Sequence, residues 1–325
     1  MAAYGDKLKI ITIGGKGSAL TSTSVYTIAT GHAQVRIDSS ALDRLTNQNR
    51  NPQKPLHSIH LINNEALNLI ETRAYLTVLL NKLLHYTNSS NVRLDVEVTE
   101  EERLIIEGSS AELYGVCAIL DHEGMGLGVV DDAVAALSCE AVKADVRSFD
   151  GVDSGDGFVD KEAATVASDM KVLLVGYDSN KRGESEAVSE IPKVNGRLRE
   201  VVKALHTMVR VELNSGVKGS SGGSRKAVGT TVSGLAIALL FLGKSSLCRV
   251  KMNLDVMGKE GLGSGLVSLF EKKCPSRDVL TNGYKAVTDL LVEEDYVKFG
   301  YGVYGLLGIV WKIVAWEEIT AVFCS

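Results

Sequence analysis

The sequence predicts a mainly α-helical protein with a small β region at its N-terminus and two helical lobes. Only four prolines occur among 325 residues, so long stretches of the chain are free to form helix. Apolar residues recur with a helical period from residue 64 onward. Runs of β-branched residues, which favour strands, are concentrated in residues 8–37.

The N-terminal region is expected to contain three short strands, at 9–13, 25–28 and 33–37. Each is rich in β-branched residues, and glycine-containing turns separate them. The glycine-rich stretch 14–18 follows the first strand, as the phosphate loop of a dinucleotide-binding fold would. Leu20 occupies the third glycine position of that motif, and residues 21–25 favour strand over helix, so we expect a hairpin turn instead.

The rest of the chain is expected to be mostly helical. Two capping boxes, each with a hydroxyl followed three residues later by a carboxylate, predict helix starts at Thr99 and Ser109. Apolar periodicity predicts helices at 64–86, 131–147, 161–175, 194–213, 225–242, 262–273, 277–294 and 299–316. Glycine-rich breaks are expected at 124–128, 151–157, 214–224 and 258–265. The polar loop 178–190 separates an N-terminal lobe, 1–185, with strands, then helices and an acidic second half, from a basic helical lobe, 186–325.

Cysteine usage and hydropathy indicate a soluble protein of a reducing compartment. The five cysteines are at least 22 positions apart and form no C-x-x-C pair. The N-terminus lacks the apolar core of a signal peptide. Lys312 interrupts the apolar run 299–316, which favours a buried helix over a membrane span. We therefore expect no membrane partner and a cytoplasmic location.

Charge is distributed very unevenly along the chain. Residues 91–190 contain eight Lys/Arg and 23 Asp/Glu, a net charge of −15, and residues 191–285 contain sixteen and six, a net charge of +10. Opposite patches of this size suit head-to-tail self-association, although the two segments could equally pair within one chain. We expect a homo-oligomer.

The basic segment is also ordered. On the helix expected at 194–213, Arg199, Lys203, His206 and Arg210 step by four, three and four, so they form one stripe. The glycine- and serine-rich loop 214–226 follows, offering backbone N–H groups and cations to an anion. We predict a surface that contacts the backbone of single-stranded RNA without reading its sequence. The candidate residues are Lys193, Arg197, Arg199, Lys203, His206, Arg210, Lys218, Arg225, Lys226, Lys244, Arg249 and Lys251.

Motifs that would carry chemistry each lack a required residue. The G-x-S-x-G match at 219–223 needs a later histidine, but the last one is His206. The P-loop-like end at 243–245 has Ala238 where the first glycine should be. The EF-hand-like stretch 154–160 lacks carboxylates at the first and twelfth ligand positions, which are Val152 and Ala163. The pair His57 and His60, the triplet Asp121-His122-Glu123 and the pair Asp131-Asp132 are interpreted as surface groups. We therefore predict no catalytic residue, metal site or cofactor.

A short motif resembles a known family. The stretch Ser221-Gly222-Gly223-Ser224-Arg225, followed by Gly229 and Ser233-Gly234-Leu235, resembles nucleocapsid proteins of negative-strand RNA viruses over about 15 residues. The resemblance implies RNA encapsidation by a helical protein, located in the host cytoplasm or the virion. The function predicted from the sequence is thus non-enzymatic packaging of nucleic acid by a self-assembling protein. Two alternatives remain: an enzyme that acts on an anionic or phosphorylated substrate through the loop 214–226, and a helical interaction scaffold.

Overall fold

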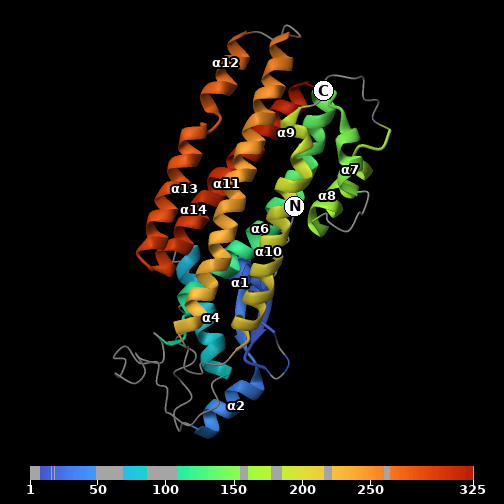
Figure 1. Ribbon diagram of the computed structural model, residues 1–325. Helices are drawn as coiled ribbons and strands as arrows, with labels where there is room; N and C mark the ends of the chain where they lie inside the picture. The colour runs from blue at the N-terminus through green and yellow to red at the C-terminus, as the bar shows by residue number, and fades with distance from the viewer. Residues whose placement is uncertain are drawn as a thin grey trace, which may run out of the picture. The chain divides into compact units, whose positions relative to one another are not determined.

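The computed structural model describes residues 8–15, 17, 19–48, 69–85, 108–153, 160–176, 185–215, 222–259 and 264–324. These residues confirm the mainly α class with a small β region at the N-terminus (Figure 1). Long helices dominate: α6 (Ala111–Ala141), α10 (Ile191–Leu213), α11 (Gly222–Lys259) and α14 (Tyr296–Cys324). The shorter ones are α1 (Ser22–Ala29), α2 (Ser39–Gln48), α4 (Ile70–His85), η1 (Val146–Phe149), α7 (Asp150–Asp153), α8 (Lys161–Leu173), α9 (Glu186–Ser189), α12 (Ser264–Lys273) and α13 (Arg277–Val292).

The chain divides into two compact units, and each is built from two stretches of sequence. Unit 1 contains Met1–His122 and Leu205–Gly229, and unit 2 contains Glu123–Ala204 and Thr230–Ser325. Helices α6, α10 and α11 contribute residues to both units. The boundary expected between residues 185 and 186 therefore lies within unit 2.

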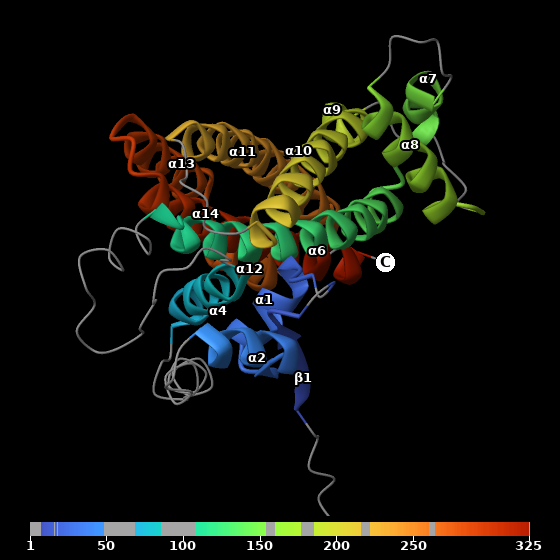
Figure 2. The ribbon, with the colours of Figure 1, turned by 90° about the horizontal axis from the view of Figure 1, so that it is seen from below.

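The β region of unit 1 is a parallel pair joined by a helix. Strands β1 (Lys9–Ile13) and β2 (Ala33–Ile37) pair in parallel, with Lys9 opposite Ala33 and Ile13 opposite Ile37. Helix α1 connects them and packs beside α4 (Figure 2). The expected hairpin is therefore wrong, because parallel strands need a crossover connection.

The strand expected at 25–28 is also wrong, because these residues belong to helix α1. Thr21 is the N-cap of α1, and its hydroxyl accepts a hydrogen bond from the Ser24 amide at 3.1 Å. Val25, Ile28 and Ala29 then share the buried face of α1. Burial of this face decides between helix and strand for β-branched residues whose local propensity favours a strand.

The C-terminal end of α10 is fixed in unit 1 by polar side chains. Lys82, which is buried on α4, donates to the Glu212 carbonyl at 2.7 Å and to the Ser215 hydroxyl at 3.2 Å. Asn81 donates to the Leu213 carbonyl at 2.8 Å. These bonds satisfy carbonyls that a helix end leaves without partners. Burial lowers the pKa of Lys82, and the charge of Glu212 opposes that shift.

Helix α6 runs without interruption through the glycine-rich stretch 124–128, where a break was expected. A Cβ atom at Gly124 would lie 3.0 Å from a methyl group of Val202, so the glycine allows α10 to approach closely. Glycine weakens a helix by only about 1 kcal/mol relative to alanine. Packing between the long helices outweighs a penalty of that size.

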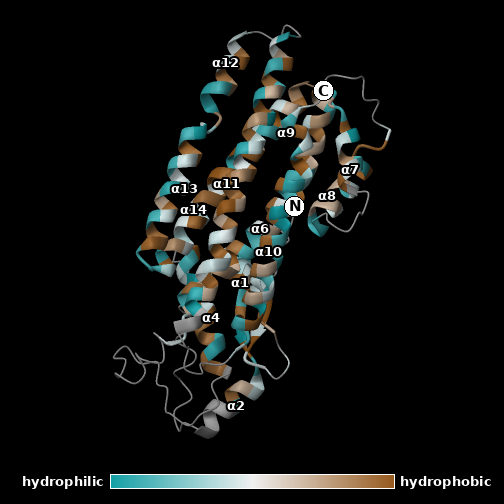
Figure 3. Cartoon of the chain, in the orientation of Figure 1, coloured by the Kyte–Doolittle hydropathy of each residue, from teal (hydrophilic) through white to brown (hydrophobic). Residues whose placement is uncertain are grey.

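Two apolar clusters lie in unit 2. One gathers α6, α8 and η1 around Phe149 and Met170, and the other gathers α11, α12 and α14 around Phe270. Helix α13 packs on α14, and Leu280 and Val287 are its buried side chains. Figure 3 shows hydrophilic and hydrophobic residues alternating along α12 and α13, as expected for helices with one buried face.

Two described helices are long and apolar enough to cross a membrane, namely α6 and residues Arg225–Lys259 of α11. In the most apolar window of each, 67% and 50% of the residues are buried in the protein. Core helices of soluble proteins meet the same criterion, so this observation is weak evidence for a membrane span.

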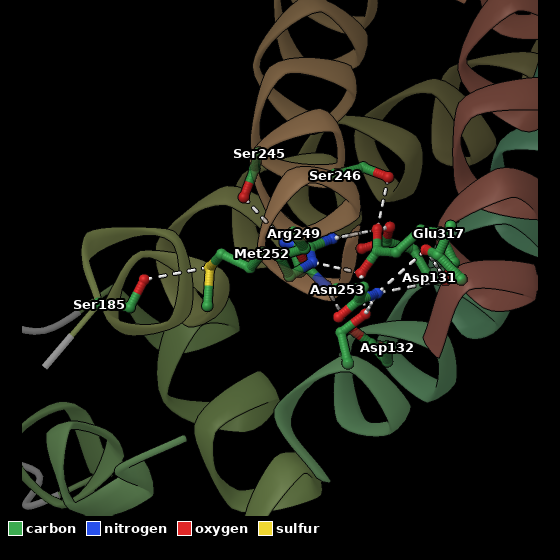
Figure 4. A network of polar contacts seen from close by, with 12 residues as sticks. Asp131, Asp132, Ser185, Ser245, Ser246, Arg249, Met252, Asn253 and Glu317 are labelled. Atoms are coloured by element: carbon green, nitrogen blue, oxygen red, sulfur yellow. Dashed lines mark hydrogen bonds and ion pairs between the residues drawn. The ribbon is translucent and has the colours of Figure 1, made fainter. Parts of the chain in front are cut away.

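A buried polar network joins α6, α11 and α14 in unit 2 (Figure 4). Arg249 donates from Nε to Glu317 Oε1 at 2.5 Å, and its Nη2 lies 3.1 Å from Glu317 Oε2 and 3.4 Å from Asp131 Oδ1. Glu317 also accepts from Ser138 at 2.9 Å and from Ser246 at 2.5 Å. The side chains of Arg249, Glu317 and Asp131 are at most 1% exposed.

Charge balance within this network explains its protonation. One guanidinium faces two carboxyl groups, so full ionisation would leave a net negative charge in the core. Burial, together with the charges of Glu317 and Asp132, raises the pKa of Asp131 to about 7, although Arg249 opposes the shift. Burial alone would lower the pKa of Arg249, but the charges of Glu317 and Asp131 raise it above its ordinary value. The Arg249–Glu317 ion pair is therefore the charged centre, and Asp131 is its titrating neighbour.

Replacing Gly196 should destabilise unit 2. A Cβ atom there would lie 2.6 Å from the backbone nitrogen of Ala163, where α10 meets α8. We expect Gly196→Ala to lower the free energy of unfolding by about 1–3 kcal/mol in urea denaturation. Gly128→Ala is the control, since its nearest neighbour would be 4.0 Å away. It should be neutral or stabilising by up to about 1 kcal/mol. Equal effects of the two variants would contradict the close approach of the helices.

Removing the guanidinium of the buried network should be far more harmful than removing an exposed cation of the same helix. Arg249→Met leaves Glu317 buried without its partner, so we expect a loss of about 3–5 kcal/mol in the free energy of unfolding. Lys251→Met, two residues further along α11 and exposed, should change it by less than about 0.5 kcal/mol. Similar urea midpoints for both variants would show that the network contributes little.

The raised pKa of Asp131 predicts a pH dependence of stability. The folded chain holds this proton more tightly than the unfolded chain, in which the pKa is about 4. The contribution of Asp131 therefore falls as pH rises from about 4 to about 7, by up to roughly 1.4 kcal/mol per pH unit. Asp131→Asn, which imitates the neutral form, should remove this part of the slope. Parallel stability curves for wild type and variant between pH 4 and 8 would contradict the shift.

Candidate functional site

A second polar cluster, in unit 1, includes partly exposed groups. Asp121 on α6 is fully buried, and its Oδ2 receives two contacts. Ser22, at the start of α1, donates from its hydroxyl at 2.5 Å, and His206 Nδ1 on α10 lies 2.9 Å away. The side chain of His206 is 44% exposed, so the cluster connects a buried carboxylate to the surface.

Local structure holds these three side chains together. Asn214, just beyond α10, accepts from the Leu20 amide at 2.8 Å and donates to the Leu20 carbonyl at 3.0 Å. These two bonds attach the residue before the Thr21 cap to the end of α10. The start of α1, where Ser22 lies, is thereby kept close to the helix that carries His206.

An ionised carboxylate can only accept hydrogen bonds, and this determines which nitrogen of His206 carries the proton. Asp121 Oδ2 cannot donate when ionised, so His206 Nδ1 must carry the proton that it shares with Asp121. In the neutral imidazole, Nε2 then has a free lone pair. Asp121 thus orients His206 as a base or hydrogen-bond acceptor.

Other groups of α1 and α6 border the cluster. The rings of Tyr26 and His122 pack against each other at a tilt of 33°, with centroids 4.1 Å apart. The Thr23 hydroxyl lies 3.3 Å from His122 Nδ1. Burial, followed by the charge of Asp121, raises the pKa of Cys117 to about 12, so this thiol is not a nucleophile at neutral pH.

The geometry does not form a serine-hydrolase relay. In such a relay the serine would bond to the histidine, but here Ser22 and His206 both contact the same oxygen of Asp121. Asp121 Oδ1 has no hydrogen-bond partner in the described structure. The cluster is therefore an aspartate–histidine pair with unused acceptor capacity, suited to acid–base chemistry or to binding a donor.

Several cations predicted to contact RNA are instead paired with carboxylates of the acidic segment. Arg199 contacts Asp132 and lies 2.7 Å from Asp169, and Lys203 Nζ lies 2.9 Å from Glu162 Oε1. His206 pairs with Asp121, as described above. In these contacts the acidic and basic segments meet within one chain. The sequence left open whether the two segments pair within one chain or between chains, and at these positions they pair within one chain.

The other residues predicted to contact RNA lie in varied surroundings. Arg197 forms an ion pair with Glu200, Arg225 donates to the Ser110 hydroxyl at 2.8 Å, and Lys244 lies 5.6 Å from the centre of the Phe241 ring. The side chains of Lys193, Arg210, Lys226 and Lys251 are exposed, and Lys218 lies outside the described residues. Arg249 is buried in the network of unit 2, so the expectation that it belongs to an exposed basic surface is wrong.

The sequence interpretation missed the burial of Asp121 and its contact with His206. Asp121, Asp131 and Asp132 were expected at an acidic surface, but they are at most 4% exposed. One signal was available: Asp121 follows the apolar run Val116–Leu120, whose members are buried. A carboxylate within an apolar helix segment is rarely buried without a partner.

Other motifs gave no site. The described residues contain no group of three or more His, Cys, Asp or Glu side chains able to hold a metal ion. His57, His60 and most of the stretches 154–160 and 219–223 lie outside the described residues, as do Thr99 and its predicted helix start.

Comparison with known proteins gives one result for the sequence and another for the fold. No family model matches the chain. A cytoplasmic histidine–tRNA ligase of Arabidopsis thaliana is 42% identical over 342 aligned residues, which cover 96% of this chain and 38% of the relative. A cytoplasmic histidine–tRNA ligase of Oryza sativa subsp. japonica is 36% identical over 202 residues, covering 59% and 25%. The chain thus spans less than two fifths of the length of these relatives.

Solved structures identify the fold. Phenylalanine ammonia-lyase from Rhodosporidium toruloides matches 98% of this chain and 69% of its own with a TM-score of 0.68 at 12% identity. Phenylalanine aminomutase from Pantoea agglomerans (96% and 89%) has a TM-score of 0.61 at 12% identity. Histidine ammonia-lyase from Trypanosoma cruzi (97% and 84%) has a TM-score of 0.60 at 15% identity. At such low identity these matches show a shared helix-rich fold and nothing more.

These findings overturn the function expected from the sequence. The expected likeness to viral nucleocapsid proteins is wrong, because the structural relatives are ammonia-lyases and aminomutases. The expectation of a non-enzymatic packaging protein is wrong as well, since the relatives found by sequence and by structure are enzymes. The short glycine- and serine-rich motif was too unspecific to identify a family. The chain has the fold of the ammonia-lyases, and its sequence is similar to part of the cytoplasmic histidine–tRNA ligases of plants.

Proposed function

We propose that the chain acts as part of a histidine–tRNA ligase-type enzyme and supports the attachment of histidine to tRNA. The observation that carries this proposal is 42% identity to the Arabidopsis thaliana ligase across 96% of the chain. A match of that length includes both units rather than a single motif. It favours a shared role over a chance resemblance.

The fold and the unit 1 cluster support a role in handling an amino acid. The structural relatives include a histidine ammonia-lyase and a tyrosine aminomutase, whose names describe action on amino acids with aromatic side chains. In unit 1, the Asp121–His206 pair supplies the kind of acid–base group that such small substrates require. This combination favours the amino acid, rather than the tRNA, as the ligand of the described residues.

The other predictions from the sequence stay predictions. An RNA partner in an enzyme of this type would be tRNA, and the exposed cations Arg210 and Lys226 would be suitable phosphate contacts. Self-association and a cytoplasmic location are likewise proposals. An anionic substrate at the loop 214–226 also stays a prediction, since residues 216–221 lie outside the described structure.

A segment exchange tests the proposal. The matched segment of the Arabidopsis thaliana ligase would be replaced by this chain, and a second variant would lack the segment. We expect the exchanged enzyme to charge tRNA with histidine within about threefold of the kcat/KM of the parent. The shortened enzyme should lose at least about tenfold, because a contribution to charging is missing.

Two outcomes would contradict this function. One is a shortened enzyme that is folded by circular dichroism and charges tRNA as well as the parent does. The other is release of ammonia from histidine, phenylalanine or tyrosine by this chain, which would assign it a lyase activity instead. Enzyme-coupled detection of ammonia measures the second directly.

A further inference from the structure

We propose that Asp121 and His206 form a binding site in unit 1 for the ammonium group of an α-amino acid, histidine in the enzyme type proposed above. The inference rests on that function for the identity of the amino acid. The site itself is inferred from an unsatisfied acceptor. Asp121 is fully buried, yet its Oδ1 has no hydrogen-bond partner in the described structure.

A buried carboxylate oxygen without a donor is unfavourable. Leaving such a group unpaired carries the full desolvation penalty of the group, which is larger when it is charged. Both contacts to Asp121, from Ser22 and His206, are made to Oδ2, so Oδ1 keeps its full capacity to accept. A ligand that completes the site must therefore donate.

The charge of the cluster defines the ligand further. Within the described residues, the ion pair of Asp121 is with His206, and no lysine or arginine shares it. When His206 is neutral, the pair carries one negative charge and Nε2 is a second acceptor. A primary ammonium has a positive charge and three N–H donors, so it complements the negative charge of the pair and the free acceptor Oδ1.

Neighbouring groups suit the remainder of an aromatic amino acid. Tyr26 lies one helical turn beyond Ser22 on α1, and His122 follows Asp121 on α6; their rings pack against each other at a tilt of 33°. Aromatic rings next to a charged anchor offer a surface for an imidazole or phenyl ring. The side chain of His206 is 44% exposed, so one member of the pair is in contact with solvent.

The test compares three small molecules by nuclear magnetic resonance of ¹⁵N-labelled histidine rings in the full chain. L-histidine and histamine carry the ammonium group, and 3-(imidazol-4-yl)propionate lacks it. We expect the free chain to show His206 protonated at Nδ1. The first two molecules should then shift its ring ¹⁵N signals saturably, while the propionate leaves them unchanged. Equal shifts from all three would overturn the ammonium assignment.

Substitutions locate the site. Asp121→Asn and His206→Asn should each weaken binding of histamine at least tenfold in isothermal titration calorimetry, whereas His32→Asn, an exposed histidine just after α1, should not. If Asp121→Asn fails to fold, Ser22→Ala keeps both site residues and should still weaken binding by severalfold. Unchanged affinity in folded Asp121→Asn, His206→Asn or Ser22→Ala would overturn the site.

The failure of this inference can be distinguished from failure of the proposed function. If the exchanged ligase charges tRNA but His206→Asn changes neither the binding of histamine nor the KM for histidine, the function stands and the site is wrong. If the shortened ligase charges tRNA as well as its parent, the proposed function is wrong whatever the binding data show.

Discussion

The ion pair between Arg249 and Glu317 is the interaction on which the arrangement of the long helices in unit 2 depends. Two charged groups at most 1% exposed are held by serines of α6 and α11 and face Asp131 of α6. Removing charges from water is costly, and the attraction between them repays that cost only when the geometry is good and the remaining atoms are hydrogen-bonded. Here α6, α11 and α14 must pack so that the side chains that supply those partners face one another. The network is thus a strong constraint on how these three helices pack.

The same principle explains why the charged segments of the sequence are misleading when read alone. A segment of net charge −15 and one of +10 suggest two opposed surfaces. In the folded chain, Arg199, Lys203 and Arg249 of the basic segment pair with Asp132, Asp169, Glu162 and Asp131 of the acidic segment. These partners are 30 to 118 residues apart, so no local pattern reveals them. Charge that appears available for a polyanion is partly used to hold helices together.

The two polar centres differ in how fully their buried carboxylates are hydrogen-bonded. Glu317 accepts four hydrogen bonds, two from serine hydroxyls and two from the guanidinium of Arg249, and its side chain is buried. Asp121 has one oxygen saturated by Ser22 and His206 and the other unpartnered, and His206 extends to the surface. Glu317, hydrogen-bonded on both oxygens in a buried site, stabilises the fold, whereas Asp121, with one oxygen unpartnered beside a partly exposed imidazole, has acceptor capacity left for a ligand.

The sequence by itself determined the helical class, and α8, α10, α12 and α13 begin and end within a few residues of their predicted positions. Those features are local: the apolar period, the caps and the scarcity of proline act within a few turns of chain. Only the tertiary structure decided that 22–29 is helix rather than strand, that β1 and β2 are parallel, and that α6 continues through its glycines. It also decided which charges are buried and brought Ser22, Asp121 and His206 together from three distant helices. Burial and pairing depend on contacts between residues far apart in sequence, and no periodicity or motif along the chain encodes them.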